Sequence, residues 1–225
     1  MEPHALFWLM SRFAHLIFDL DGTLVDTKAD LAEASNHMLT YFGLPQLSPT
    51  QVADYVGDGV RVLVERVLGP NNASLVSRGF TLFMEYYGAH LLDHTRPYAG
   101  IEQLLVATQG RGIILSVLTN KPEAPSRAIV AGLGLARYFT EVVGSDTLST
   151  KKPDPQGVFY LQRLTGIALP ETLLIGDSRV DCETGRAAGV STCGVTWGFD
   201  ASGLASLPPQ FVVDTPEELS SLVFS

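Results

Sequence analysis

Two aspartates follow a short apolar run near the start of the chain, in "HLIFDLDGTLVDT". Side chains alternate along a strand, so Asp19 and Asp21 point the same way unless a turn at Gly22 bends the chain first. A second apolar run, "TLLIGDS", brings Asp177 to its end, and Asp181 follows at the start of an expected helix, near the same edge. The spacing therefore predicts four carboxylates beside one cleft.

Acids gathered in this way require a cation. Without one the carboxylates repel one another, and some of them take up protons. Carboxylate oxygens completed by water suit magnesium, which proteins commonly hold through one or two carboxylates plus a phosphate. Taken singly, Asp19 and Asp177 are also typical of residues that cap the turns or helices after them. Two such acids at strand ends of one sheet favour a magnesium site over two independent caps.

Further polar groups are expected at the same edge. Thr119 and Asn120 end the apolar run "IILSVLT", and Lys152 precedes a proline in "STKKPDP". Alone, each is typical of a cap or a solvated charge. Together they supply a hydroxyl, an amide and an ammonium, which are the groups that could hold the oxygens of a phosphoryl group.

The elements that must position these groups alternate along the chain. Short apolar, β-branched runs are typical of strands buried on both faces, and helix-like segments lie between them. Repeated strand and helix predict an α/β core, a Rossmann-like parallel sheet with helices on both faces. The expected strands are 15–20, 112–119, 141–146, 172–178, 191–198 and 211–214, and the expected helices include 122–133, 153–165 and 179–188.

One region breaks the alternation. Residues 27–96 contain amphipathic stretches and no good strand, so we expect an inserted all-helical cap domain there. The remaining segments, 1–26 and 97–225, would form the α/β core. An insertion directly after the first strand would lie over the carboxyl edge of the sheet, where open α/β sheets bind ligands. A helical subdomain that only enlarges the core is the alternative.

Composition narrows the class of protein and its partners. The chain has 225 residues and a net charge of −9, which disfavours nucleic acid and anionic membranes as partners. Two cysteines, Cys182 and Cys193, are too few for a disulfide scaffold and indicate the reducing cytoplasm. The apolar start, "MEPHALFWLM", lacks the features of an export signal and is too short to span a bilayer. We expect it to pack on the surface or on another subunit, in a monomer or small homo-oligomer.

The ordered motifs "DLDGTLVDT", "LTNKP", "KKPDP" and "GDSRVDCETGRAAG" resemble those of the haloacid dehalogenase superfamily, over nearly the whole chain after Phe13. The resemblance implies that Asp19 attacks phosphorus to form an aspartyl-phosphate. Asp21 would protonate the leaving oxygen and later activate water. It also implies magnesium ligands: Asp19, the backbone carbonyl of Asp21, and Asp177. Asp181 would be either a contact of a metal-bound water or a partner of a ligand.

The resemblance adds Thr119 and Lys152 to the catalytic set. Lys151 and Lys121 compete with Lys152 for the role of holding phosphate. Lys152 is preferred because it stands immediately before the proline of the third motif, as in the family pattern. Asn120 is expected to bind substrate.

Within the superfamily, "VGDGVRVLVERVLG" resembles the Gly-x-Gly segment of bacterial phosphoglycolate phosphatases. Gly57 and Gly59 would let backbone N–H groups approach an anion at a helix start, and Arg61 could pair with a substrate carboxylate. An ordinary glycine-rich helix entry, with Arg61 as a solvated charge, is the alternative. The segment also departs from the relatives, which often have Asn at position 58 and an acid at position 61, where this chain has Asp58 and Arg61.

The leading hypothesis is a magnesium-dependent phosphomonoester hydrolase acting on a small phosphorylated substrate, first of all 2-phosphoglycolate. A phosphatase of another small sugar or acid phosphate, and a phosphomutase of the β-phosphoglucomutase type, are the alternatives. Dehalogenase chemistry needs neither Asp21 nor magnesium, so the second acid argues against it. A non-enzymatic regulatory relative is less expected, because every catalytic residue of the pattern is present.

Overall fold

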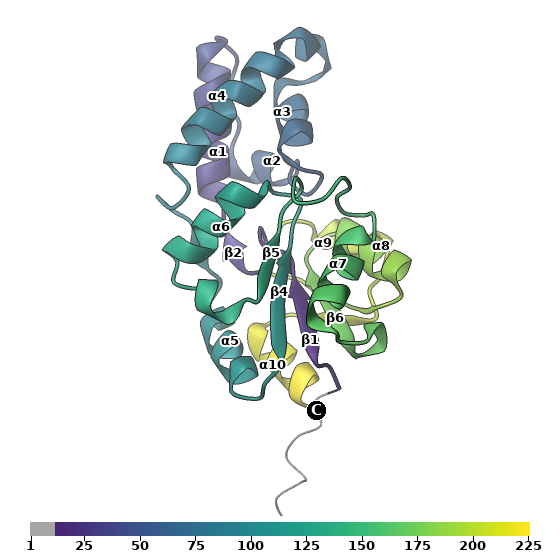
Figure 1. Cartoon of the computed structure of the whole chain (residues 1–225). Helices are drawn as coiled ribbons and strands as arrows, with labels where there is room; N and C mark the ends of the chain where they lie inside the picture. The colour runs from purple at the N-terminus through teal and green to yellow at the C-terminus, as the bar shows by residue number, and fades with distance from the viewer. Residues whose placement is uncertain (1–11) are drawn as a thin grey trace, which may run out of the picture.

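The computed structural model describes residues 12–225, so the interpretation of residues 1–10 as a packing arm lies outside the described part of the chain. In Figure 1 a layered α/β core carries a separate group of helices on one side. Among the described residues, no helix combines the length and the apolar character needed to cross a membrane.

The core is built on one parallel sheet with β1 near its centre. Strand β1 pairs with β4 on one side and β6 on the other, which places Phe18 opposite Val117 and Ile175. Both neighbours are parallel, so the carboxyl ends of the strands meet at one edge. Across the sheet the strands are β5 (Glu141–Val143), β4 (Ile114–Leu118), β1 (His15–Phe18), β6 (Thr172–Gly176), β7 (Ser191–Val195) and β8 (Phe211–Val213).

Helices cover both faces of the sheet. Alternation along β1 sends Leu16 and Phe18 into one apolar cluster and Ile17 into the other. Helices α5, α6 and α10 contribute to the first cluster, and α7 and α8 to the second. The core helices are α5 (Ile101–Gln109), α6 (Glu123–Gly132), α7 (Gln156–Thr165), α8 (Arg179–Ala188), α9 (Ala201–Ser206) and α10 (Pro216–Phe224), with short η2 (Ala136–Tyr138) and η3 (Leu169–Glu171).

The predicted fold class is confirmed, with strands shorter than expected at their carboxyl ends. The strand expected over 172–178 ends at Gly176, and the one expected over 191–198 ends at Val195. The final residues of the apolar runs have left the sheet, because they turn into the loops that carry the polar groups.

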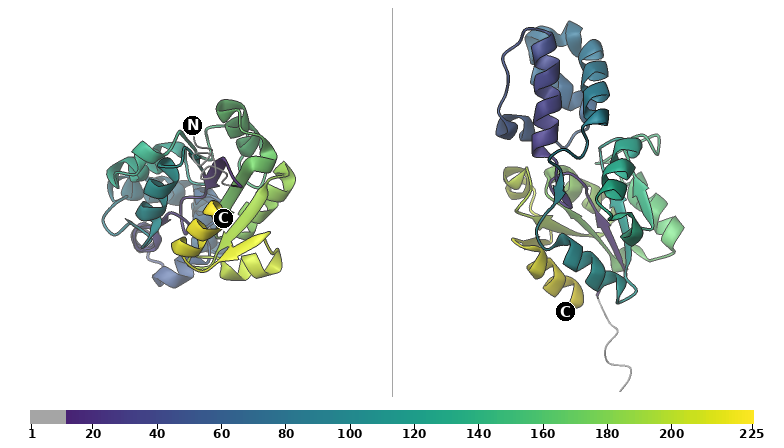
Figure 2. Two further views of the ribbon diagram at one scale, coloured as in Figure 1. Left: turned by 90° about the horizontal axis from the view of Figure 1, so that it is seen from below. Right: turned by 90° about the vertical axis from the view of Figure 1, so that its left-hand side faces the viewer.

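Helices α1 to α4 form an insertion between β1 and β4 with an apolar cluster of its own. Figure 2 (right) shows these helices standing above the sheet. Phe83 and Met38 are fully buried inside this cluster, so the insertion has its own small core. Its elements are α1 (Lys28–Tyr41), α2 (Pro49–Ala53), α3 (Val60–Leu68), η1 (Pro70–Leu75) and α4 (Val76–Ala89).

Two chain segments join the insertion to the core, and they pair with each other. Strands β2 (Val25–Asp26) and β3 (Arg96–Pro97) form a short antiparallel ladder. Asp30 fastens the return segment, because its carboxylate accepts hydrogen bonds from the backbone N–H groups of His94 and Thr95 at 2.9 Å each.

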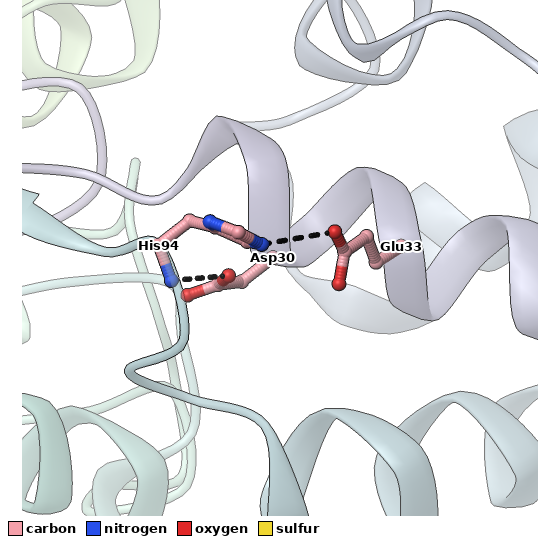
Figure 3. A group of neighbouring side chains, drawn as sticks. All are labelled: Asp30, Glu33 and His94. Carbon is pink, nitrogen blue, oxygen red and sulfur yellow. Dashed lines mark hydrogen bonds and ion pairs between the residues drawn. The ribbon is translucent and has the colours of Figure 1, made fainter.

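The Thr95 hydroxyl adds a third hydrogen bond to Asp30, at 2.6 Å. The His94 ring points toward Glu33 (Figure 3), and its Nε2 lies 3.1 Å from Glu33 Oε1. The carboxylate of Asp30 therefore connects α1 to the segment that returns from the insertion to the core. The division into two domains at 26/27 and 96/97 remains a prediction.

Candidate active site

A cavity of about 680 Å³, counting the part open to solvent, lies between the carboxyl edge of the sheet and the helical insertion. Asp19, Asp21, Thr119, Asn120 and Asp177 all line it. The structure therefore brings together the strand-end groups that the sequence predicts. Such edges of parallel sheets are where α/β proteins bind ligands.

Asp19 is held by the end of β1. Its backbone N–H continues the sheet ladder by donating to Ile175 O at 2.9 Å, and its carboxylate accepts from the backbone N–H of Leu20 at 2.7 Å. The chain then turns at Gly22, which has a φ of 79°. A Cβ atom at this glycine would lie 2.2 Å from Asp177 Oδ2, so the turn and the approach to Asp177 both require glycine.

Asp19, Asp177 and Asp181 form a buried acidic cluster whose carboxylate oxygens lie within 4.8 Å of one another. Burial raises the pKa of Asp19 to about 6, with Lys152 opposing the shift and Asp181 adding to it. Burial also raises the pKa of Asp177 well above its usual range, and repulsion from the other two carboxylates adds to that shift. A cation would relieve this repulsion and let the acids ionise, so the donor set suits a metal ion.

Asp177 is fixed at the end of β6 by two hydrogen bonds. The backbone N–H of Phe199 donates to Oδ2 at 2.6 Å, and the Thr23 hydroxyl donates to Oδ1 at 3.4 Å. A Cβ at Gly198 would also meet this carboxylate. The carboxylate is therefore seated tightly between the loops that follow β1 and β7.

Lys152 bridges the acids. Its ammonium lies 3.0 Å from Asp19 Oδ1 and 2.6 Å from Asp181 Oδ1. Burial opposes its charge, but the two carboxylates outweigh burial and raise the pKa of Lys152 above its usual range. Asp181 also accepts from the Ser178 hydroxyl at 2.6 Å at the start of α8. The structure thus makes Asp181 a partner of Lys152 within the acidic cluster.

Asp21 has a separate set of partners. Its carboxylate accepts a hydrogen bond from the Thr27 hydroxyl at 2.7 Å. The ammonium of Lys121 lies 2.9 Å from both of its oxygens. Burial disfavours the charged form of Lys121, but Asp21 and Tyr87 raise the pKa of Lys121 above its usual range. The two aspartates of the first motif therefore reach one cavity in different electrostatic surroundings.

The residues that follow β4 connect the cavity to β5, to the insertion and to the loop that carries Lys152. Thr119 donates its backbone N–H to Val143 O at 2.9 Å and is buried beside the acids. The Asn120 amide donates to two carbonyl oxygens, Gly57 O at 2.9 Å and Lys152 O at 3.0 Å. Asn120 therefore links the insertion to the loop that carries Lys152.

The amino-acid sequence matches a known protein family over the region that forms this site. The sequence profile of the family described as Haloacid dehalogenase-like hydrolase matches residues 16–195. The chain belongs to this family. The predicted resemblance is thereby confirmed, and the matched span runs from β1 through β7, with every residue of the acidic cluster inside it.

Several members of the family are similar over most of their length. A phosphoglycolate phosphatase of Neisseria meningitidis serogroup A is 40% identical over 194 residues, covering 84% of this chain and 83% of the relative. One from Pseudomonas syringae pv. tomato is 35% identical over 206 residues, covering 88% of this chain and 75% of the relative. The crystal structure of a predicted phosphoglycolate phosphatase from Haemophilus somnus 129pt superposes with a TM-score of 0.89 at 31% identity, covering 95% of this chain and 99% of that one.

The glycine-rich loop of this family member seats the insertion on the core. Gly57 and Gly59 both line the cavity and have positive φ values of 123° and 93°. The carbonyl of Gly57 accepts the bond from Asn120, and that of Asp58 accepts one from the Lys151 ammonium at 2.6 Å. In this conformation the carbonyl groups of the loop face the core and hold the two parts together.

Arg61 does not join the other predicted site residues. Its side chain is exposed, and its guanidinium lies 5.3 Å from the ring centroid of Phe80 in α4. It is not among the residues that line the cavity, whereas Val60 and Leu63 are. Residues three apart share a helix face, so the phase of α3 turns Val60 and Leu63 inward and Arg61 away.

The pairing of Lys121 with Asp21 is a feature of the site that sequence reasoning missed. The motif "LTNKP" identified Lys121 only as a competitor for holding phosphate. Its side chain is 5% exposed and paired with Asp21. The available signal was its position, two residues after Thr119 at a strand end, which is inside the predicted site.

Proposed function

We propose that this protein is a magnesium-dependent phosphomonoester hydrolase acting on a small acid phosphate, first of all 2-phosphoglycolate. One observation carries the proposal: two carboxylates from one strand end enter one cavity with different partners. Asp19 lies with the acidic cluster and Lys152, whereas Asp21 lies with Lys121 and Thr27. Different surroundings allow two identical side chains to take different chemical roles.

In the proposed reaction Asp19 attacks the phosphorus atom. A bond forms between its carboxylate oxygen and phosphorus while the ester P–O bond breaks, and Asp21, which must enter this step in its carboxylic-acid form, gives its proton to the leaving oxygen. Asp21 then takes a proton from water, which attacks the phosphorus of the aspartyl-phosphate. This second step releases inorganic phosphate and regenerates the Asp19 carboxylate.

Asp19, Asp177 and the backbone carbonyl of Asp21 would hold magnesium. When bound, the ion supplies positive charge that stabilises the ionised acids and the phosphoryl oxygens. The donor set supports the assignment, because Asp19 and Asp177 are buried and their pKa values are raised without a cation. Thr119 and Lys152 would bind the remaining phosphoryl oxygens.

The insertion, expected as a cap domain over 27–96, would close this site from water. The contacts from Asn120 to Gly57 and from Lys151 to Asp58 support this role, because they join the insertion to the core beside the acids. Its inner wall is apolar, with Leu31, Leu63 and Phe83 facing the cavity. Excluding water strengthens the electrostatic interactions at the phosphoryl group and limits side reactions.

The choice of substrate rests on the relatives named phosphoglycolate phosphatase. A cytoplasmic enzyme with no nucleic-acid or membrane partner, working as a monomer or small homo-oligomer, is part of the same proposal. The net charge of −9 supports it, as do the two cysteines, which are both free and buried.

The decisive experiment measures phosphate release from a panel of small phosphate esters, with magnesium and with a chelator. We expect turnover of 2-phosphoglycolate that requires magnesium and is abolished in Asp19→Asn. Asp54→Asn is the matched control, because Asp54 is an exposed aspartate at the C-terminal end of α2, away from the acidic cluster. Retention of activity by a folded Asp19→Asn variant would contradict the mechanism, and full activity in chelator would contradict the metal requirement.

A further inference from the structure

The cavity wall carries more acidic than basic side chains. Four aspartates line it, and among residues 12–225 Lys121 is the one lysine, arginine or histidine that does so. The wall contributed by the insertion is apolar, formed by side chains such as Val60, Leu63, Phe83 and Met84. A substrate whose leaving group carries a carboxylate therefore has one cationic side chain of the cavity wall to meet.

Lys121 is held at the boundary between core and insertion. Its ammonium lies 2.9 Å from each oxygen of Asp21 and 4.7 Å from the ring centroid of Tyr87 in α4. The side chain is 5% exposed, so its position is largely fixed by packing. An ammonium has three donors, and contact with both oxygens of Asp21 leaves one for another acceptor.

We propose that Lys121 binds the carboxylate of the substrate's leaving group and holds it beside Asp21. This inference rests on the proposed function and names the residue that recognises the carboxylate of the substrate. In 2-phosphoglycolate a single methylene separates the carboxyl carbon from the ester oxygen. One ammonium can therefore contact the carboxylate while the adjacent Asp21 reaches the ester oxygen that leaves.

Three other cations near this end of the molecule are placed for different tasks. Lys152 is paired with Asp19 and Asp181, where the phosphoryl group would bind. Lys151 donates to the Asp58 carbonyl, and Arg61 is exposed against Phe80. Lys121 alone among these four combines a place on the cavity wall with direct contact to the proposed acid.

The test compares two esters of nearly the same size and shape. 2-Phosphoglycolate and 2-hydroxyethyl phosphate differ in that a neutral CH₂OH group replaces the carboxylate. We expect Lys121→Met to lower the ratio of their kcat/KM values, acid over neutral, by roughly 10- to 100-fold relative to wild type, as for a lost charge-assisted hydrogen bond. Both substrates will also lose a common factor, because Asp21 loses its partner.

Product inhibition provides a second measurement that does not depend on the chemical step. The inhibition constant of glycolate should rise in Lys121→Met, while that of inorganic phosphate should change little. Lys121→Gln, which keeps a polar group beside Asp21, repeats both measurements in case the methionine variant fails to fold. Circular dichroism of each variant establishes that the fold is retained.

Lys151→Met is the matched control. It removes a lysine at the same boundary, but one whose ammonium contacts the Asp58 carbonyl. Any loss in this variant should be equal for the two esters, because it affects the seating of the insertion.

Several outcomes would overturn the inference. An unchanged ratio in both Lys121 variants would make the lysine a support for Asp21 alone, and a selective loss in Arg61→Ala instead would move carboxylate binding there. Equal wild-type rates for the two esters would refute carboxylate recognition while leaving the phosphatase intact. Failure of the wild-type protein to hydrolyse either ester would refute the proposed function itself, and the inference with it.

Discussion

The Lys152 ammonium lies 3.0 Å from Asp19 Oδ1, and both side chains are nearly buried where β1 meets the loop before α7. Asp181 anchors the same ammonium from the other side at 2.6 Å. The proposed nucleophile is thus aligned by a lysine that has its own carboxylate support. The position of Asp19 therefore depends, through Lys152, on Asp181, which does not itself need to touch the substrate.

Asp181→Asn should lower kcat/KM by roughly 10- to 100-fold, because it replaces a charge-assisted hydrogen bond to Lys152 with a weaker one. Steady-state kinetics on 2-phosphoglycolate measures the effect. Glu183→Gln is the control, since Glu183 on the same helix makes a solvent-accessible pair with Arg179. Surface pairs of this kind contribute little, so the control should behave as wild type. Equal activities of the two variants would argue against the anchoring role of Asp181.

Gly22→Ala should disturb Asp177 as well as the backbone. Alanine at this positive φ is strained, and its Cβ would clash with the Asp177 carboxylate, 2.2 Å away. Gly43→Ala separates the two effects, because Gly43 has a φ of 66° and a Cβ added there would have nothing within 4 Å.

We expect each of these variants to lose about 1 kcal/mol or more of stability from backbone strain. Gly22→Ala should lose more, and it alone should need a higher magnesium concentration for half-maximal activity. Chemical denaturation and a magnesium titration measure the two effects. An unchanged titration in Gly22→Ala would argue that Asp177 is not a ligand.

Gly59→Val should reduce activity on charged and neutral esters alike. A Cβ at Gly59 would lie 3.2 Å from the Asn120 carbonyl and 3.1 Å from the Lys151 ammonium, so valine pushes the insertion off the core. Gly69→Val is the control, with a φ of 75° and open space around its Cβ position. A loss of activity confined to 2-phosphoglycolate would instead support direct recognition of the substrate carboxylate by this loop.

His15 should make stability depend on pH below neutrality. It is fully buried at the start of β1, its Nε2 lies 2.9 Å from the Ser116 hydroxyl, and burial lowers its pKa to about 4. Between this value and the unfolded value of 6.5 the unfolded chain binds more protons, so stability is present above pH 6.5 and lost as pH falls toward 4.

The loss from His15 should be about 2 kcal/mol between pH 7 and pH 5. Urea denaturation at a series of pH values, for wild type and His15→Gln, isolates it as the difference between the two curves. Parallel curves would mean that His15 titrates normally in the folded protein.

Apolar runs that end in polar residues were sufficient to predict the sheet and the edge beside which the cavity lies. Asp19, Thr119 and Asp177 each follow such a run, and parallel pairing must bring these ends together. The pairing of Lys121 with Asp21 could not be predicted, because it depends on the path of two loops after their strands. The orientation of Arg61 could not be predicted for a different reason: the helix phase beyond Gly59 decides which side chains face the cavity.

Magnesium should stabilise the folded protein through the acidic cluster, independently of turnover. The buried carboxylates of Asp19 and Asp177 repel each other, and a cation that binds the folded state alone raises the unfolding temperature by mass action. Asp177→Asn removes one of these charges, so the metal-free variant should unfold at or above the temperature of metal-free wild type. The rise in its unfolding temperature on adding magnesium should be smaller than that of wild type.

Asp200→Asn is the control, because Asp200 lines the cavity but caps α9 through the Gly203 N–H at 2.8 Å, outside the acidic cluster. Thermal unfolding with and without magnesium makes the comparison, and an equal gain in wild type and Asp177→Asn would place the metal elsewhere.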